Sequence, residues 1–500
     1  MRTVAHNTAF LTGASMVQKA LSFVYFTLLA VTFSTDQIGA YSYSLAFTAI
    51  FAIIVDGGLT QVLIRFVAKN PGEARTLFFR VLKIKLALLL VALGAMTIVV
   101  THVTAAYSTK NIIFLAAAIM IVDSLNLSVY GVLRGHQDLV YESVGLIAAQ
   151  LTSLCGAVAV AFLHLPITAA LLGLGLGSLV NASIGIIGLF RSGLLQSVSQ
   201  STLKFATLIR EATPFAIAGA CARGYSYLDL LLLGSFTNFT IAGIYSIANK
   251  LTFVFQFIPL ALSAALYPAF SKLIGVDSET LRKLWHGAER YLILMLGAIV
   301  MLLISLRFDI LGFFNQSHVP AASTTLIILS ISLCFSFLSY PVGAVLNAAG
   351  LQKLQTTAMA VTLGVNAALN VILIPRLGAV GAAMSALFGN FLLFAIGAWF
   401  VQRRAITLPW MDVAKLTGAC VICALAGSAA IFGAKYMLAS SLSAISAAHV
   451  GRFTSKAIIF VTLAALSIVG LVLYAAALCV MNVVKKDDLM QLRNRFKRVV

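Results

Sequence analysis

The sequence predicts an all-α polytopic membrane protein with about 14 transmembrane helices. Of its 500 residues, 61% are hydrophobic and only 10% are charged, whereas soluble globular chains have about 45–50% apolar and about 25% charged residues. The apolar runs do not alternate with polar residues at a period of two, as the strands of a membrane barrel do. The chain also lacks a polar block long enough for a separate soluble domain, so we do not expect catalysis in a water-exposed domain.

A helix needs about 20 mostly apolar residues to cross the hydrocarbon core of a bilayer. The first apolar run is expected to be a retained span, because it lacks the short apolar core and small-residue cleavage site of a secretory signal. By the criterion of about 20 mostly apolar residues, the predicted spans are 10–33, 41–65, 83–102, 111–133, 142–163, 167–190, 211–234, 241–270, 289–306, 323–349, 355–374, 378–400, 414–434 and 458–482.

The basic residues predict the orientation of these spans. Most of the 34 Lys and Arg residues, Lys85 among them, fall on the side that holds the N-terminus. Cytoplasmic loops are enriched in Lys and Arg, so both termini are predicted to be cytoplasmic. This asymmetry accounts for most of the net charge of +19, and no nucleic-acid partner is needed to explain it. The C-terminal stretch VVKKDDLMQLRNRFKRVV can form a basic amphipathic helix on anionic lipid.

An internal repeat divides the chain. Residues 7–42 align without a gap on residues 211–246, at an offset of 204. Two six-helix lobes in parallel orientation are therefore expected, at 1–200 and 201–405, followed by two further helices and the basic tail at 406–500; a binding site between such lobes is typical of transporters. The aligned pairs that carry this repeat are Gly39 and Gly243, Tyr41 and Tyr245, Ser42 and Ser246, and the cations Lys19 and Arg223.

Several charged residues lie within predicted spans. A charge at the bilayer centre costs at least about 2.5–3.5 kcal/mol, and such residues usually face protein or a water-filled cavity. Arg65 lies near the cytoplasmic end of its span, where it can snorkel to the interface, and it is also a candidate cytoplasmic gate. The residues deeper in the spans are Lys19, Asp56, Asp123, Arg223, Asp229 and Lys250.

The matched cations predict an anion site. Lys19 and Arg223, one from each lobe, would face each other across a central cavity with positive walls. The expected ligand is a large anion carried within lipid, such as a sugar diphosphate headgroup, because the planar guanidinium suits phosphate. Tyr227, four residues after Arg223, shares its helix face, and Lys250 is a further lumen candidate. The alternative is a structural salt bridge from Arg223 to Asp56 or Asp123.

The aspartates have three interpretations. Asp56, Asp123 and Asp229 could balance the lumen cations, carry a coupling proton or sodium ion, or lock helices together. No other cofactor and no metal site is predicted: Cys420 and Cys423 lack a second ligand pair, and there is no Walker motif.

Three segments resemble one known family. They are IGAYSYSLAFTAIFAIIVDGGLTQVLIRF, YSIANKLTFVFQFIPLALSAALYPAFSKL and LNAAGLQKLQTTAMAVTLGVNAALNVILIPRLGAVGAAMSA. Together with the span count, the chain resembles Wzx-type O-antigen repeat-unit flippases of the multidrug/oligosaccharidyl-lipid/polysaccharide superfamily.

This resemblance implies a transporter and not an enzyme. It would carry an undecaprenyl-diphosphate-linked oligosaccharide across the bacterial inner membrane by alternating access, with ion antiport and a cationic lumen at Lys19, Arg223 and Lys250. Implied partners are the polyprenyl-diphosphate-linked glycan, the bilayer, and the polymerase and chain-length proteins of a polysaccharide pathway such as that of lipopolysaccharide.

Three alternatives stay open. A lipid II flippase ranks second, because those relatives carry an arginine-rich first span and here that span has Lys19 alone. A drug or small-cation exporter of the same superfamily would have twelve spans and acidic cavities. A membrane glycan polymerase or glycosyltransferase would need acids and bases in its outer loops, which are short here.

Overall fold

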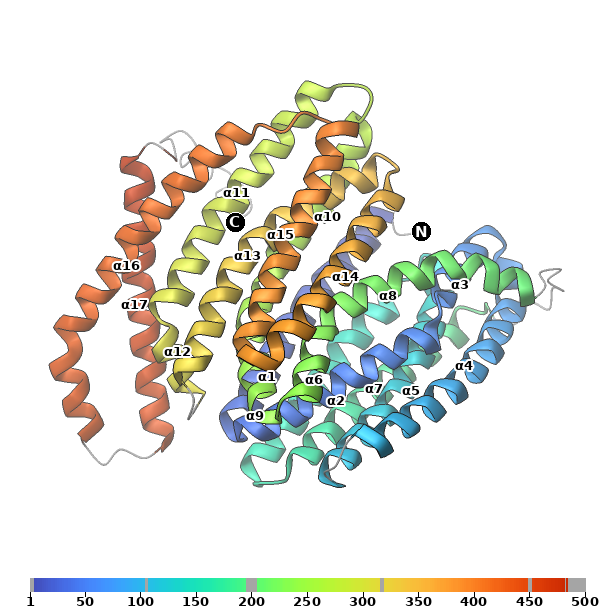
Figure 1. Cartoon of the computed structure of the whole chain (residues 1–500). Coiled ribbons are helices and arrows are strands. Elements are labelled where there is room, and N and C mark those ends of the chain that lie inside the picture. The colour runs from blue at the N-terminus through green and yellow to red at the C-terminus, as the bar shows by residue number, and fades with distance from the viewer. Residues whose placement is uncertain are drawn as a thin grey trace. The chain divides into compact units, whose positions relative to one another are not determined.

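The computed structural model describes residues 4–103, 107–194, 205–314, 319–447, 452–481 and 483, and every regular element within them is a helix (Figure 1). The predicted amphipathic tail lies, apart from residue 483, outside the described residues. The helices are α1 (Val4–Thr32), α2 (Thr35–Asp56), α3 (Leu59–Lys69), η1 (Pro71–Glu73), α4 (Ala74–Val103), α5 (Tyr107–Gly135), α6 (Val140–Phe162), α7 (Ile167–Arg191), α8 (Phe205–Phe236), α9 (Phe239–Phe253), η2 (Val254–Gln256), α10 (Phe257–Leu273), α11 (Ser278–Ser305), α12 (Arg307–Phe313), α13 (Val319–Ala348), α14 (Gln352–Leu377), α15 (Ala379–Arg404), α16 (Trp410–Ala447) and α17 (Arg452–Val480).

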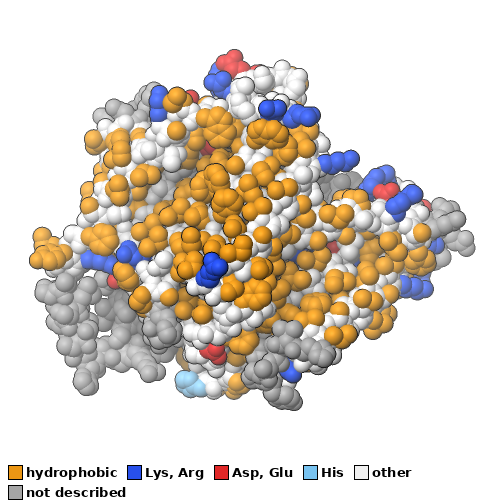
Figure 2. Space-filling model, viewed as in Figure 1, with side chains coloured by type: hydrophobic (Ala, Val, Ile, Leu, Met, Phe, Trp, Pro, Cys, Tyr) orange, Lys and Arg blue, Asp and Glu red, His pale blue; other side chains and the backbone are white. Residues whose placement is uncertain are grey.

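The all-α polytopic class is confirmed. Within the described residues, 13 helical segments are long and apolar enough to cross a membrane. The predicted span 211–234 is not one of them, although α8 has 32 residues, because Arg223, Asp229 and several polar side chains lower its hydropathy. Hydrophobic side chains cover most of the face shown in Figure 2, and Lys and Arg side chains lie in small groups between them.

The second predicted span, 41–65, is two helices. Gly57 and Gly58 have φ values of +50° and +74°, a conformation that side chains other than glycine rarely adopt, and they separate α2 from α3. A Cβ atom on Gly58 would lie 2.6 Å from the backbone nitrogen of Ala216 on α8, so the break also allows α8 to approach closely. The predicted span 241–270, in contrast, is one continuous helical segment, Phe239–Leu273, in which the short 3-10 turn η2 joins α9 to α10.

The helices form two compact units. The first unit holds residues 1–257 and 359–385, and the second holds 258–358 and 386–500. The first has a core around Leu63, Val81 and Leu133, and the second has one around Phe270 and Trp285. This division follows packing, whereas the predicted lobes follow the sequence repeat, so those lobe boundaries stay predictions.

The repeat is visible in the first unit, where α2 crosses α9. A Cβ atom on Gly39 would overlap the backbone of Phe239, and a Cβ atom on Gly243 would overlap the backbone of Thr35. These contacts are reciprocal, because 35 and 239, like 39 and 243, are related by the offset of 204. Glycine at both positions therefore allows the two helices to cross backbone to backbone near their N-termini.

A hydrogen bond recurs at the same offset. Tyr25 on α1 bonds Tyr41 on α2, with 3.1 Å between the hydroxyl oxygens, and Tyr245 on α9 donates to Asp229 on α8 at 2.9 Å. In both pairs the partners are 16 residues apart, and Asp229 stands where the first repeat has Tyr25. Equivalent helix pairs thus share one contact, but only the second pair contains an ionisable acid.

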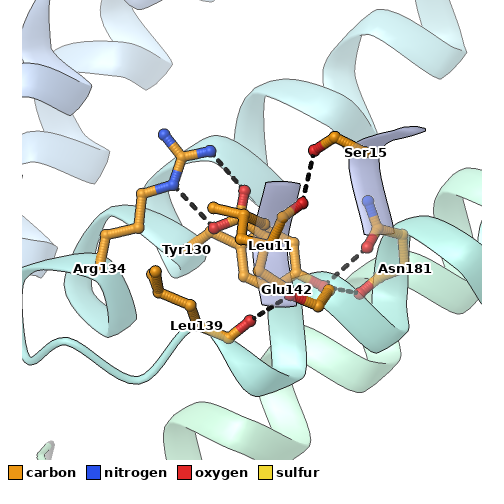
Figure 3. A network of polar contacts seen from close by, with 8 residues as sticks. Leu11, Ser15, Tyr130, Arg134, Leu139, Glu142 and Asn181 are labelled. Carbon is orange, nitrogen blue, oxygen red and sulfur yellow. Dashed lines mark hydrogen bonds and ion pairs between the residues drawn. The ribbon is translucent and has the colours of Figure 1, made fainter. Parts of the chain in front are cut away.

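Polar contacts also join α5, α6 and α7 (Figure 3). Arg134, in the last turn of α5, donates through Nε to Glu142 on α6 at 2.7 Å and through Nη2 to the other carboxylate oxygen. Tyr130, one turn earlier, donates to Asn181 on α7 at 2.7 Å. Because the Glu142 side chain is buried, its pairing with Arg134 avoids an isolated charge inside the bundle.

Candidate functional site

A small pocket lies where the break between α2 and α3 meets α8 in the first unit. Its volume is about 30 Å³, room for roughly one or two water molecules. The pocket contains two of the predicted charged residues, Asp56 and Arg223. Its lining consists of Ile53, Asp56, Gly58, Phe215, Ala216, Gly219 and Arg223.

Asp56 is paired with Lys85 on α4. The Nζ atom of Lys85 lies 2.9 Å from Asp56 Oδ1, and the hydroxyl of Thr60 donates to the same oxygen. The side chain of Lys85 is only 3% exposed. The sequence predicts Lys85 on the cytoplasmic side, near the start of the span 83–102; the observed helix α4 already begins at Ala74, and Lys85 lies buried inside the bundle.

Arg223 forms no ion pair with any described residue. Of the two salt bridges considered from the sequence, the one to Asp56 is replaced by the Asp56–Lys85 pair, and Asp123 on α5 has an exposed side chain with no ion pair among the described residues. Arg223 thus lines the pocket with its positive charge available.

Asp229 is the centre of a second, buried cluster in the first unit. Asn370 on α14 donates through Nδ2 to Asp229 Oδ1 at 2.6 Å and to Asn366 Oδ1 at 2.9 Å, and Tyr245 donates to Asp229 Oδ2. Asn370 Oδ1 and the hydroxyl of Thr362, one turn before Asn366, are buried without a hydrogen-bond partner among the described residues. No basic group of the described residues pairs with Asp229 either. The Asp229 carboxylate therefore accepts hydrogen bonds from an amide group on α14 and a hydroxyl on α9 but lacks a counter-charge, which a proton or a small cation would supply.

The two lysine candidates are associated with α1. Lys250 on α9 lies 5.5 Å from the centre of the Phe26 ring, a cation–π contact, and has no ion pair among the described residues. Lys19 precedes Phe26 by seven residues, about two helical turns, so both project from one side of α1 about 10 Å apart along its axis. Neither lysine is among the residues that line the pocket around Arg223.

Two other predicted residues lie apart from these clusters. Arg65 on α3 is half exposed and pairs with Glu211 on α8 at 2.9 Å, a contact that joins these helices near their ends. Tyr227 is 38% exposed and does not line the pocket. Sequence reasoning missed Lys85, Asn366 and Asn370; the two asparagines four residues apart in an apolar span were the available signal.

Comparison with known protein families shows which family the chain belongs to. A model of the family described as "Polysaccharide biosynthesis protein" matches residues 4–274, more than half of the chain. The chain belongs to the polysaccharide biosynthesis protein family. A second model, MatE, matches residues 214–372, and the predicted membership of the multidrug/oligosaccharidyl-lipid/polysaccharide superfamily is confirmed.

Two named relatives and one solved structure are similar to this family member. It is 29% identical over 189 residues to the "Probable flippase AglR" of Haloferax volcanii, a match that covers 37% of this chain and 40% of that relative's length. It is 22% identical over 379 residues to the "Probable low-salt glycan biosynthesis flippase Agl15" of the same organism, covering 74% of this chain and 78% of the relative. Among solved structures, "Lipid II flippase MurJ, inward closed conformation" has the same fold, with a TM-score of 0.71 at 14% identity over 93% of this chain and 97% of that one.

The second unit of this polysaccharide biosynthesis family member holds an unpredicted acid. Glu289 on α11 is 1% exposed, and neither of its carboxylate oxygens has a hydrogen-bond partner among the described residues. Helix α11 begins at Ser278 and α4 at Ala74, so the offset of 204 extends to these helices and places Glu289 opposite Lys85 in the alignment. The counterpart of Asp56 is Leu260, which explains why the second repeat lacks the equivalent ion pair.

We expect Glu289→Met to stabilise the protein in detergent. An unpaired buried polar group costs about 1–3 kcal/mol, and methionine of similar length removes that cost. The midpoint of thermal unfolding should rise by a few degrees. The matched control is Glu279→Met at the exposed start of the same helix, where little change is expected. A lower midpoint for Glu289→Met would show that the carboxyl group has a stabilising partner.

Proposed function

We propose that this chain is a flippase that carries a polyprenyl-diphosphate-linked oligosaccharide across the membrane by alternating access. The observation that carries the proposal is Arg223, an arginine in the middle of α8 that lines a pocket and has no ion pair among the described residues. A guanidinium that lines a pocket of a membrane protein and forms no ion pair with the described residues favours an anionic ligand, and its fork geometry matches phosphate.

The pocket around Arg223 is small compared with the proposed substrate. A volume of about 30 Å³ cannot hold a diphosphate with its sugars. Binding in this proposal therefore requires a state in which the helices around Arg223 have moved apart, which alternating access supplies. Lys19 and Lys250, both without ion pairs among the described residues, would add positive charge to the opened lumen.

The proposal includes ion coupling at Asp229. A carboxylate this deeply buried, with no basic partner among the described residues, requires a proton or a cation to be stable. Asn370 presents its amide nitrogen to Asp229 in this state, so a hard cation, which prefers carboxylate and carbonyl oxygens, would bind after this amide turns its unpartnered oxygen toward the carboxylate. A proton or a sodium ion bound at Asp229 would couple its gradient to the movement of the substrate.

Location and partners follow from the same proposal. We place the chain in the bacterial inner membrane with both termini cytoplasmic, delivering glycan to the polymerase and chain-length proteins of a polysaccharide pathway such as that of O-antigen. No enzymatic activity is included. A lipid II substrate is the second candidate, because the fold resembles that of a lipid II flippase, but α1 has Lys19 alone where arginines would be expected.

The test is complementation of a flippase-null strain with defined repeat units. Arg223→Ala should lower surface glycan at least about tenfold at an unchanged membrane level, because hydrogen bonds to charged groups contribute about 1.5–3 kcal/mol. Arg223→Lys should retain part of the activity. The matched control is Arg191→Ala at the exposed end of α7. Full surface glycan from Arg223→Ala would contradict the proposal.

A further inference from the structure

We propose that Lys85 is a positioning residue: by neutralising Asp56, it keeps Arg223 free to bind the phosphate groups of an anionic substrate. This inference rests on the proposed function, since it assigns to a residue outside the pocket lining the task of maintaining the charge within it. Three observations carry it: the donors that Lys85 uses, the charges in the cluster, and the position of Arg223.

Lys85 has no hydrogen-bond donor left for a substrate. Its ammonium group has three donors, and three acceptors lie around it: Asp56 Oδ1 at 2.9 Å, Thr60 Oγ1 at 2.9 Å and the Ser124 carbonyl at 3.5 Å. The side chain is almost completely buried. Lys85 therefore acts on Asp56 and not on the transported molecule.

The Asp56 carboxylate is in turn oriented toward Lys85. The hydroxyl of Thr60 donates to the same carboxylate oxygen that accepts from Lys85, and it accepts a bond from Lys85 itself. The three side chains form a closed triangle on α2, α3 and α4. This arrangement aligns Asp56 with the buried amine and leaves Arg223 without an ion partner across the pocket.

The charges of the cluster then decide what the pocket attracts. One carboxylate and two cations leave a net charge of plus one, located at Arg223. Without Lys85, Asp56 would be an unpaired carboxylate in the lining of the same pocket, and in a poorly solvated site opposite charges attract strongly. Arg223 would then pair with Asp56, and the pocket would become neutral toward phosphate.

The experiment measures binding of farnesyl diphosphate, a short-chain polyprenyl diphosphate, to the purified full-length protein. Lys85→Met should weaken binding at least about tenfold, the size of interaction typical for charged groups in contact. Asp56→Asn should bind the probe more tightly than the native chain, because it removes the competing carboxylate. The double variant Asp56→Asn, Lys85→Met should return to within about threefold of the native affinity. Lys83→Met, an exposed lysine on the same helix, is the matched control.

Different outcomes would contradict the proposed anion site at Arg223 and the proposed role of Lys85. If Arg223→Ala leaves the affinity unchanged, the anion site itself is wrong. If Arg223→Ala weakens binding but Lys85→Met does not, only the role of Lys85 is overturned. A double variant as weak as Lys85→Met would also overturn it, since Lys85 would then act directly or through the fold. Where Lys85→Met fails to fold, weaker binding by Asp56→Asn alone would contradict the inference.

Discussion

Replacing Asp229 with asparagine should abolish the response of transport to an imposed ion gradient and slow transport about 100-fold, the upper range of coupling between two sites. Asparagine is close to aspartate in shape and can still accept the hydrogen bond from Tyr245, while the Asn370 amide can turn its unpartnered oxygen toward the new NH2 group, so the local fold should persist. It carries no charge, so it can neither hold a cation firmly nor release a proton. The measurement is translocation of a fluorescent lipid-linked glycan in proteoliposomes under sodium or pH gradients.

The repeat supplies a matched control for this experiment. Tyr25→Phe removes the hydrogen bond to Tyr41 at the position equivalent to Asp229, in an equally buried site. Because no ionisable acid is lost there, the response to the gradient should remain. A gradient response that survives in Asp229→Asn would show that the coupling ion binds elsewhere. If transport by the native chain responds to only one of the two gradients, sodium or pH, that response identifies the coupling ion.

Replacing Gly39 or Gly243 with leucine should prevent the chain from folding. Each glycine packs against the backbone of the other helix, so no rotamer of a larger side chain relieves the overlap and the helices must separate. Overpacking a well-packed core costs about 1–3 kcal/mol and occasionally more, and contact with a backbone belongs to the upper end. The yield of monodisperse protein in size-exclusion chromatography measures this loss.

Gly94→Leu on α4 is the control for helix propensity and bulk. Nothing within 4 Å would meet a Cβ atom at Gly94, and leucine is a better helix former than glycine. This variant should be recovered in normal yield. Normal yields for both Gly39→Leu and Gly243→Leu would mean that α2 and α9 do not cross as closely as described.

The fold was largely predictable from the sequence because the signals that define it are local. Apolar runs of sufficient length correspond to the observed helices, and the gapless alignment at an offset of 204 matches the reciprocal glycine contacts and the paired hydrogen bonds. The main differences between the predicted spans and the observed helices arise at glycines and at charged residues. Gly57 and Gly58 divide one predicted span, and the charges of α8 remove another from the helices that qualify by hydropathy.

The candidate site was less predictable because it depends on which helices face one another. Lys85 lies close to other basic residues in the sequence, so the charge pattern places it at the cytoplasmic end of its span, whereas the start of α4 at Ala74 puts it well within a helix. That Asp56 pairs with Lys85 and not with Arg223 is decided by packing of α2, α3 and α4, which no local pattern encodes. Asp229 was predicted as an ion candidate, but its asparagine partners come from α14, 137–141 positions further along the chain.

The glycine crossing provides a pivot about which α2 and α9 can tilt against each other. If α9 tilts against α2, the smallest displacement is at the pivot formed by Gly39 and Gly243. Asp56 lies 17 residues beyond Gly39, about 25 Å along the axis. With that lever arm, a tilt of about 10° shifts the Asp56 end of α2 by about 4 Å. A small rotation at two glycines is thus enough to change the access to Arg223.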